Sequence, residues 1–309
     1  MSFHEAPFQK MSFHKMPFHK MHGLGNDFIV LDLRDGSEMP SADQMRLLAD
    51  RRLGIGCDQI MVLSHPEQGG DMHLAMFNAD GSVAGACGNG TRCVAWFEMQ
   101  NHQRDSLMIE TISGMLHARN AGDKMIEVNM GKPRFLSGEI PIDSASTSHA
   151  DPQKLAFDDM PFGPAFCVNM GNPHAVFMVE DAEAVDVEKW GRFYESHPVF
   201  PDRANIEFIS LSAENQIRMR VYERGAGITR ACGSGACAAG VAVLTHAQKI
   251  AQNVPGRVEV ILDGGSLWIE WAGIDYQGVA GDVLMTGPIT YVAGGEYVVD
   301  TSSGELSAG

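Results

Sequence analysis

The sequence predicts a mixed α/β protein made of two related halves, because one short motif occurs twice. ACGNG stands at residues 86–90 and ACGSG at residues 231–235, which places their cysteines, Cys87 and Cys232, 145 positions apart. A chain of 309 residues is long enough for about two domains, and this separation is about the length of one.

The surroundings of the two motifs are also alike. Each motif is followed by a segment that suits a helix, at 91–99 and at 236–244, and each is preceded by a segment that suits a strand. The strand ends in a polar residue nine positions before the cysteine, at Asn78 in the first half and at Glu223 in the second. Each half is therefore expected to bring one thiol to the beginning of a helix.

The chain begins with a tandem repeat, in which SFHEAPFQKM is followed directly by SFHKMPFHKM. Its lysines and histidines are compatible with a basic tail or a metal-binding tract. A local duplication, or true initiation at Met11 or Met16, is the interpretation we favour. We expect disorder before about His14 and treat residues 1–19 as a separate, disordered segment.

Regular secondary structure is predicted from Lys20 onward. A buried strand is expected at 28–33 and a helix at 42–52, which Ser41 caps. The other predicted strands are short apolar or alternating segments, at 60–63, 73–78, 107–112, 115–119, 125–129, 165–169, 175–179, 207–211, 217–223, 257–262 and 266–270. Residues 143–161 are rich in Ser, Asp and Pro and are expected to form a loop.

Composition and charge limit the classes of function. The chain is 44% hydrophobic and 20% charged, as in ordinary globular proteins, and its net charge of −16 argues against a nucleic-acid-binding surface. No segment approaches the roughly 18 apolar residues of a membrane span, and the beginning of the chain lacks the apolar core of a signal peptide. We therefore expect a cytoplasmic protein that acts on a small molecule.

The six cysteines are expected to be free thiols, metal ligands or catalytic groups in a reducing compartment. Four of them are assigned to packing: Cys57, Cys93, Cys167 and Cys237. Cys87 with Cys93, or Cys232 with Cys237, is an alternative metal pair. Structural zinc prefers two to four residues between cysteines together with closing ligands, whereas the gaps here are five and four, so we expect no metal. A disulfide between Cys87 and Cys232 is disfavoured by the compartment, although two facing thiols could oxidise in air.

A pair of cysteines at helix N-termini suits the inversion of a carbon atom. The helix dipole favours the thiolate, and glycines beside the cysteine leave N–H groups open to a carboxylate. One thiolate can take an α-proton while the opposite thiol returns one. Acid–base catalysis accelerates a reaction by about 10²- to 10⁴-fold. Removal of an α-proton needs a larger acceleration, so dipoles that stabilise the enediolate must supply the rest of it.

Nine motifs follow one another from about Lys20 to Val292. They are MHGLGNDF (21–28), GIGCDQ (54–59), FNADGS (77–82), ACGNGTRC (86–93), GNPH (171–174), RANI (203–206), VYERGAG (221–227), ACGSGAC (231–237) and MTGP (285–288). In these motifs the sequence resembles the diaminopimelate epimerase family.

The resemblance implies interconversion of LL- and meso-diaminopimelate without pyridoxal phosphate or metal. It implies two pseudo-symmetric halves, each a curved, barrel-like sheet around a central helix, with the active site in the cleft between them and a homodimeric assembly. We place the N-terminal half at 20–131 plus 286–309 and the C-terminal half at 132–285. The tail beyond Val292 departs from the family, and we expect it to be at least partly disordered.

The resemblance also assigns site residues. Cys87 and Cys232 match the catalytic pair. The residues that match substrate contacts are Asn26, Gln59, Asn78, Gly88, Asn89, Asn172, Asn205, Glu223, Arg224, Gly233 and Ser234. Of these, Arg224 suits a distal carboxylate, because its guanidinium can bind one with two hydrogen bonds. His174, like Glu223, matches a position that orients the reacting amino group or tunes the thiols.

Two other functions stay open. One is a cysteine-pair racemase of another amino acid on the same fold, which would not need the distal set Asn172, Asn205 and Arg224. The other is a thiol redox or metal-binding module, in which no α-proton would exchange.

Overall fold

The first half of the molecule alternates strands with two helices. The computed structural model describes residues 13–143, 145, 151–157, 161–249, 256–275 and 278–300. The elements of the first half are β1 (Phe13–Gly23), β2 (Asn26–Asp32), α1 (Ala42–Ala49), β3 (Gln59–Ser64), β4 (Met72–Asn78), α2 (Gly88–His102), β5 (Ser106–Thr111), β6 (Gly114–Asn120) and β7 (Met125–Asn129).

The second half follows the same style and adds several short elements. They are η2 (Pro152–Lys154), β8 (Phe166–Asn169), β9 (Pro173–Met178), η3 (Ala182–Ala184), α3 (Val187–Glu195), β10 (Asn205–Ala213), β11 (Gln216–Glu223), β12 (Gly227–Ile228), α4 (Gly233–Lys249), β13 (Arg257–Leu262), β14 (Gly265–Trp271), β15 (Val283–Pro288) and β16 (Thr290–Asp300).

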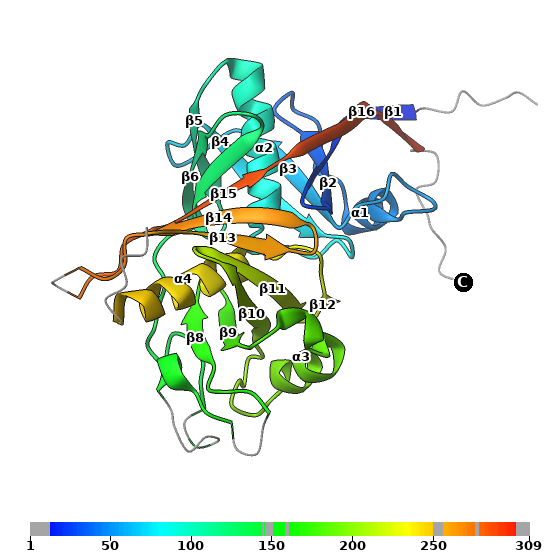
Figure 1. Ribbon diagram of the computed structural model, residues 1–309. Coiled ribbons are helices and arrows are strands. Elements are labelled where there is room, and N and C mark those ends of the chain that lie inside the picture. Colours follow the sequence, from blue (N-terminus) through cyan, green and yellow to red (C-terminus); the bar gives the residue numbers. More distant parts are fainter. Residues whose placement is uncertain are drawn as a thin grey trace, which may run out of the picture.

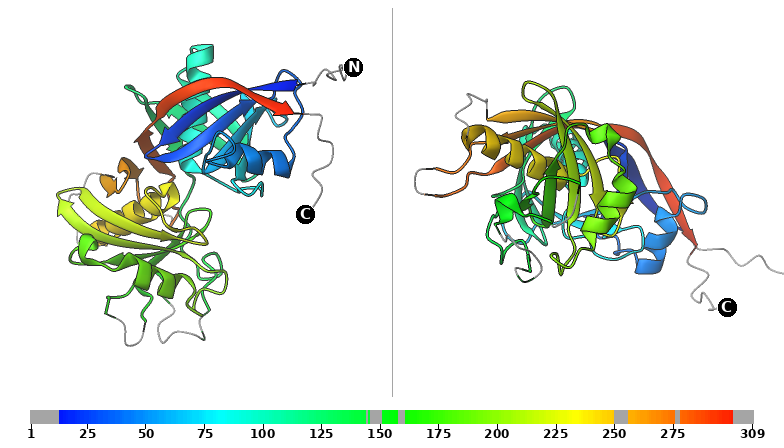
Figure 2. Two further views of the ribbon diagram at one scale, coloured as in Figure 1. Left: turned by 90° about the vertical axis from the view of Figure 1, so that its right-hand side faces the viewer. Right: turned by 60° about the horizontal axis from the view of Figure 1, so that its bottom comes forward.

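One continuous sheet joins the two halves. Its hydrogen-bonded order is β16-β1-β2-β3-β4-β5-β6-β7-β15-β14-β13-β11-β10-β9-β8, with β12 beside β11. Strand β15 pairs with β7 of the first half and β14 of the second, so it forms the seam between them. The sheet curls into two lobes, which are seen separately in the left view of Figure 2.

The two halves repeat one topology. In the first, β1–β2 is antiparallel, β2–β3 parallel, β3–β4 antiparallel, β4–β5 parallel and β5–β6–β7 antiparallel. The second has the same series in β8–β9–β10–β11–β13–β14–β15. The helices also correspond, because α2 connects β4 to β5 and α4 connects β11 to β13 (Figure 1). The predicted fold of two related α/β halves is therefore confirmed.

Each half packs its sheet around one helix. Helix α2 contacts strands β1, β2, β3, β5, β6 and β7, and α4 contacts β8 to β11 and β13 to β15. The inward side of α4 consists of small buried residues, among them Ala236, Ala238 and Ala239, which allow the surrounding strands to approach it closely. Figure 1 shows α2 in the upper lobe and α4 in the lower.

The predicted helices and strands are present with shifted ends. Helix α1 begins after Ser41, whose side chain forms a capping box with Gln44. It ends at Ala49 and not at residue 52, because the Asp50 carboxylate accepts hydrogen bonds from the backbone N–H groups of Arg52 and Leu53 and turns the chain. Helix α3 was not predicted, although Asp186 caps it and Val187, Gly191 and Tyr194 are buried at helical spacing.

The beginning of the chain corrects the sequence-based expectation. Part of the segment 1–19 that was expected to be disordered is strand β1, and part of the tail beyond Val292 is strand β16. The two strands pair antiparallel from Phe13 with Asp300 to His22 with Thr290, and Met16 is buried beneath them. Each therefore gains an ordered backbone from a partner at the opposite end of the sequence. The repeat up to residue 12 and the tail from residue 301 lie outside the described residues, as does much of the predicted loop 143–161.

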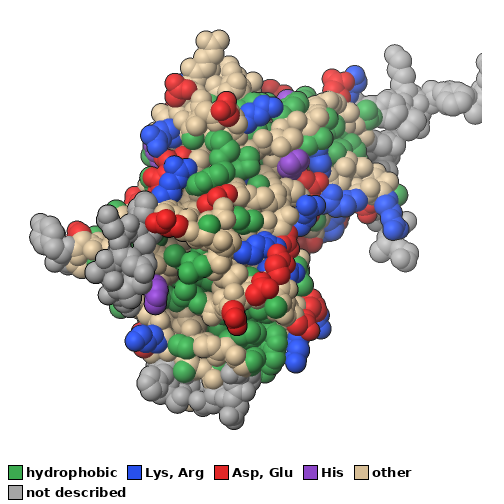
Figure 3. All heavy atoms as spheres, in the orientation of Figure 1, with side chains coloured by type: hydrophobic (Ala, Val, Ile, Leu, Met, Phe, Trp, Pro, Cys, Tyr) green, Lys and Arg blue, Asp and Glu red, His purple; other side chains and the backbone are tan. Residues whose placement is uncertain are grey.

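The apolar core consists of separate clusters around the four helices. Two buried clusters surround α2 and α1, and two others surround α4 and α3. On the face drawn in Figure 3, acidic and basic side chains are interspersed. Within the described ranges, no helix is long and apolar enough to cross a membrane. The division at 131/132 and 285/286 stays a prediction.

Candidate active site

The first thiol caps helix α2. Cys87 has an extended backbone (φ −152°, ψ 99°), and its Sγ accepts a hydrogen bond of 3.4 Å from the N–H of Gly90. Its carbonyl oxygen accepts from the N–H of Thr91 at 2.9 Å. The side chain is half-buried, so it is partly open to a ligand.

The second thiol repeats this geometry at the head of α4. The Sγ of Cys232 accepts from the N–H of Gly235 at 3.4 Å, and its carbonyl oxygen accepts from the N–H of Ala236 at 2.9 Å. The Ser234 hydroxyl lies 3.7 Å from the sulfur. Cys232 is the more buried of the two cysteines.

The two helix heads meet in the interior of the molecule. The Asn89 side-chain amide donates to the carbonyl oxygen of Ala231, the residue before Cys232, at 3.2 Å. A Cβ added to Gly88 would lie 2.7 Å from Met285 Cε, and one added to Gly233 would lie 3.2 Å from Met285 Sδ. Both glycines therefore let their helix head approach the same methionine of β15, the seam strand.

The environment of the thiols differs from the sequence-based expectation. Burial raises the pKa of the Cys87 thiol to about 11, and the Gly90 N–H offsets this only in part. Burial raises the pKa of Cys232 well above its usual range, and the carboxylates of Glu223 and Glu207 raise it further. The helix heads do favour the thiolate, but burial outweighs them, so an additional positive group is needed to make either thiol a base.

Glu223, at the end of β11, interacts electrostatically with both thiols. Its carboxylate accepts a hydrogen bond from the Thr229 hydroxyl and interacts with the Cys232 thiol. Its charge also raises the pKa of Cys87. Burial raises the pKa of Glu223 itself. Because this carboxyl group interacts with both thiols, proton transfer at either sulfur changes its electrostatic environment.

A chain of three side chains lies near Cys232, and two of them, His174 and Glu207, are fully buried. His174 Nδ1 is 2.7 Å from Glu207 Oε1, and His174 Nε2 is 2.8 Å from Asn172 Oδ1. Glu207 Oε2 has no hydrogen-bond partner among the described residues. A Cβ on Gly235 would lie 2.8 Å from Glu207 Oε1, which puts this carboxylate against the head of α4.

Glu207 was predicted as part of a strand and not as a site residue. The signal that could have found it is an acidic residue among the apolar positions of that strand.

The amide residues of the first half form two hydrogen-bonded groups. Asn26 Oδ1 accepts from the Asn89 amide at 3.2 Å and lies 3.8 Å from Cys87 Sγ. Gln59 donates to Asn78 Oδ1 at 3.0 Å, and Asn78 donates to Ser82 at 3.0 Å. These contacts hold Asn26 beside the first thiol and Gln59 with Asn78 at neighbouring strand ends.

Asn205 and Arg224 lie together in the second half. The Asn205 amide donates to the Pro173 carbonyl oxygen, and its Oδ1 accepts from the backbone N–H of Arg224, both at 3.0 Å. The Arg224 side chain is exposed and donates to the carbonyl oxygen of Asp202 at 3.1 Å. Asn205 thus fixes the backbone at Arg224, while the guanidinium reaches toward solvent.

The other four cysteines are packing residues, as predicted. Cys57, Cys93, Cys167 and Cys237 are buried, and each belongs to a different apolar cluster. In the part of the chain that the structure describes, no group of three or more His, Cys, Asp or Glu side chains is arranged to hold a metal ion.

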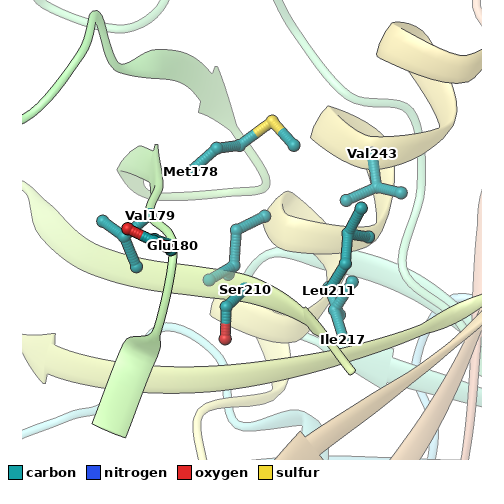
Figure 4. Close-up of a pocket in the computed structure, with 8 residues that line it drawn as sticks. Met178, Val179, Glu180, Ser210, Leu211, Ile217 and Val243 are labelled. Carbon is teal, nitrogen blue, oxygen red and sulfur yellow. The ribbon is translucent and has the colours of Figure 1, made fainter. Parts of the chain in front are cut away.

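An apolar cavity of about 220 Å³ lies away from the thiols, between β9, β10 and α4. Figure 4 shows Met178, Val243 and Leu211 around it, with Ile217 nearby. Its lining includes neither cysteine of the pair nor any of the predicted substrate contacts.

Comparison with known sequences gives one consistent result. The family model described as diaminopimelate epimerase matches residues 18–136 and 166–292. A diaminopimelate epimerase of Rhodospirillum centenum is 46% identical over 288 residues, covering 93% of this chain and 94% of the relative. One of Phenylobacterium zucineum is 44% identical over 269 residues, covering 87% of this chain and 92% of the relative.

Solved structures show the same fold at low sequence identity. A phenazine biosynthesis protein of the PhzF family from Bacillus anthracis has a TM-score of 0.65 and 16% identity, covering 93% of this chain and 100% of that one. A hydroxyproline epimerase from Agrobacterium vitis with bound trans-4-hydroxy-L-proline has a TM-score of 0.63 and 15% identity, covering 94% of both chains.

Proposed function

Because the chain belongs to the diaminopimelate epimerase family, we propose that it interconverts LL- and meso-diaminopimelate with Cys87 and Cys232 as the acid–base pair. The reaction would serve lysine and peptidoglycan-precursor synthesis. The observation that carries the proposal is the matched position of the two thiols, each at a helix head and each accepting an N–H bond of 3.4 Å. The two heads are joined directly by the contact from Asn89 to Ala231.

The proposed reaction moves one proton at each face of one carbon. A cysteine thiolate accepts the α-proton, and the C–H electron pair moves into the carboxylate to form an enediolate-like state. The opposite cysteine, as a thiol, donates its proton to the other face of that carbon. After one turnover the two cysteines have exchanged protonation states, and the number of protons is unchanged.

The helix heads are suited to stabilise the charge that develops. The first N–H groups of α2 and α4, at Gly88, Asn89, Gly233 and Ser234, have no intrahelical acceptor, so they are available to a carboxylate. Fixed dipoles aimed at an enediolate contribute most in a site that excludes water. Asn26, Gln59 and Asn78 would contact the substrate beside these groups, and Glu223 would orient the substrate ammonium.

The second amino-acid head would bind at the distal set. Arg224 offers a guanidinium for a carboxylate, and the amides of Asn172 and Asn205 offer oxygens for an ammonium. His174 would hold Asn172 through their 2.8 Å contact. A substrate with a single amino-acid head would leave these groups unused.

The direct test is exchange in deuterated water. Wild-type protein with LL-diaminopimelate should place deuterium at the inverted carbon. Cys87→Ala and Cys232→Ala should each abolish inversion with unchanged circular dichroism, while Cys57→Ala, a buried cysteine outside the pair, should keep activity. Near-normal turnover in either single variant would exclude the two-base scheme.

A competition assay tests the substrate class. LL-diaminopimelate should be inverted in preference to free histidine, lysine and proline. Inversion of one of these with comparable kcat/KM would favour the racemase of another amino acid. Bound stoichiometric zinc without any exchange would favour the metal or redox module.

We also propose that the chain acts in the cytoplasm as a homodimer, on the basis of the family resemblance. Light scattering at the protein concentration of the activity assay should give twice the chain mass. A fully active monomer would contradict the dimer and leave the proposed reaction intact.

A further inference from the structure

A single arginine is fully buried at the point where the two helix heads meet. Arg92, in the second turn of α2, has 0% exposure. Its Nη2 donates to Asn89 Oδ1 at 2.9 Å, and its Nη1 lies 3.5 Å from the Gly88 carbonyl oxygen and 3.6 Å from Met285 Sδ. Its Nε has no hydrogen-bond partner among the described residues.

Two glycines make room for this guanidinium. A Cβ on Gly23 would lie 3.2 Å from Arg92 Nη2, and a Cβ on Gly287 would lie 3.0 Å from Arg92 Nε. Gly23 ends β1 and Gly287 belongs to the seam strand β15. The backbones of α2, β1 and β15 therefore surround a charged group. An apolar side chain would pack more readily at this position.

The charge of Arg92 is not neutralised within the described part of the chain, where no carboxylate forms an ion pair with it. Arg34 gives the contrast, because its guanidinium binds the carboxylates of both Asp32 and Glu98. A buried charge without a counter-ion is costly. An anion that forms or binds close to Arg92 would offset this cost.

The contacts of Arg92 lead to both thiols. Through Oδ1 it fixes the Asn89 side chain, whose amide then donates to Asn26 Oδ1 and to the Ala231 carbonyl oxygen. Asn26 lies beside Cys87, and Ala231 precedes Cys232. The same side chain thus orients the contact between the helix heads and places positive charge behind them.

We propose that Arg92 is a positioning residue of the epimerase reaction, which fixes Asn89 and balances the negative charge that forms on Cys87 and on the substrate carboxylate. This inference rests on the proposed function. The groups that face Arg92 are the thiols of Cys87, Cys93 and Cys237, and the charged group that faces Cys87 from β11 is Glu223.

Arg92 makes the electrostatic environments of the two thiols unequal. Arg92 lies five positions after Cys87, and Cys237 takes the same position after Cys232. On the other side, Met61 meets Gly90 of the first head, whereas Glu207 meets Gly235 of the second. Cys87 therefore has a buried cation behind it and Cys232 a buried anion, so Cys87 is the more readily ionised thiol before substrate binds.

The test compares Arg92→Met, Arg92→Lys and the wild type. Arg92→Met keeps an unbranched side chain, shorter than that of arginine, and removes the charge, so kcat should fall about 100-fold and KM should change less. The pH profile of kcat/KM should shift to alkaline pH by about one unit. Alkylation of Cys87 by iodoacetamide without substrate should slow about tenfold, while that of Cys232 should change less. Arg92→Lys restores a charge and should recover most of the alkylation rate.

Arg34→Met is the matched control, because it leaves Glu98 buried without its partner. It should lower the melting temperature and keep kcat per folded molecule, whereas Arg92→Met should lose kcat per folded molecule. Loss of activity in Arg92→Met only in proportion to unfolded protein, with unchanged alkylation of Cys87, would overturn the proposal.

The outcomes separate this inference from the proposed function. If the wild type exchanges α-deuterium and Arg92→Met is unaffected in both rates, the inference fails and the epimerase stands. If the Cys87 alkylation rate depends on Arg92 but the wild type exchanges no α-deuterium, the proposed function fails and Arg92 retains only its effect on the thiol.

Discussion

The side-chain amide of Asn89 donates a hydrogen bond of 3.2 Å to the carbonyl oxygen of Ala231. Asn89 follows the first thiol by two residues, and Ala231 precedes the second by one. The contact therefore ties the head of α2 to the head of α4 without involving either sulfur. Its strength should affect how well the two thiols are aligned on one carbon.

Asn89→Ala should show this directly. It removes the donor to Ala231 and Asn26 and leaves the Arg92 guanidinium without its 2.9 Å acceptor. A buried polar group left without a partner costs about 1–3 kcal/mol, so the free energy of unfolding should fall by that order and kcat/KM should fall with it. Urea denaturation and the epimerase assay measure the two effects.

Asn101→Ala provides the control, because Asn101 is an exposed residue near the end of the same helix. It should change stability by no more than about 0.5 kcal/mol and leave turnover unchanged. If Asn89→Ala behaved like Asn101→Ala, the contact between the helix heads would contribute to neither stability nor turnover.

The unequal environments of the two thiols predict an order of alkylation. Burial raises the pKa of Cys87 to about 11 and that of Cys232 well above its usual range, with two carboxylates adding to the second shift. Because the thiolate is the reactive form, iodoacetamide should modify Cys87 first, and the rate should continue to rise with pH above pH 9. Peptide mass mapping after timed quenching gives the rate at each site.

In the same experiment Cys93 and Cys237 serve as internal controls, since both are fully buried. They should stay unmodified until the protein unfolds. Modification of Cys232 ahead of Cys87 would show that the charges of Glu207 and Glu223 do not control the two thiols in solution.

Much of this site was predictable from sequence because its elements recur. Cys87 and Cys232, and the strand ends Asn78 and Glu223, are the same positions of the two halves and have the same spacing. The repeat extends further in the structure: Gln59 lies beside Phe28 in parallel register, and Asn205 lies beside His174 in the same way. Those positions differ in residue type, so comparison of the halves alone could not align them.

The residues that were missed are those whose role depends on distant partners. Arg92 in a helix and Glu207 in a strand have ordinary solvated alternatives, and their burial comes only from packing between elements far apart in sequence. Strand β1 carries Pro17 and no regular alternation. The proline is tolerated because β2 pairs only with His19 to Gly23, which leaves one side of β1 unpaired at residue 17.

The pairing of the chain ends predicts a measurable contribution to stability. A chain that ends at Val292 loses the partners of β1 from Lys20 back to Phe13 and uncovers Met16. Its melting temperature should fall relative to a chain that ends at Asp300, which keeps every pair of that ladder. Equal melting temperatures by differential scanning calorimetry would mean that the β1–β16 ladder adds no stability beyond Val292.

Glu207→Gln tests the buried anion behind Cys232. The variant keeps an oxygen for the 2.7 Å contact with His174 Nδ1 and removes the charge that raises the pKa of Cys232. The pKa of Cys232 should therefore fall, and its alkylation rate at pH 8 should increase by about tenfold if the shift is about one unit. Glu207→Asp keeps the charge and should leave the rate close to that of the wild type, although the shorter side chain loosens the contact with His174.

Glu207→Gln should also narrow the pH range of maximal kcat/KM. Turnover requires one cysteine to keep its proton while the other is ionised. A lower pKa of Cys232 should therefore move the alkaline limb of the profile to lower pH. An unchanged Cys232 alkylation rate in Glu207→Gln, with normal circular dichroism, would contradict the electrostatic role and reduce Glu207 to a structural partner of His174.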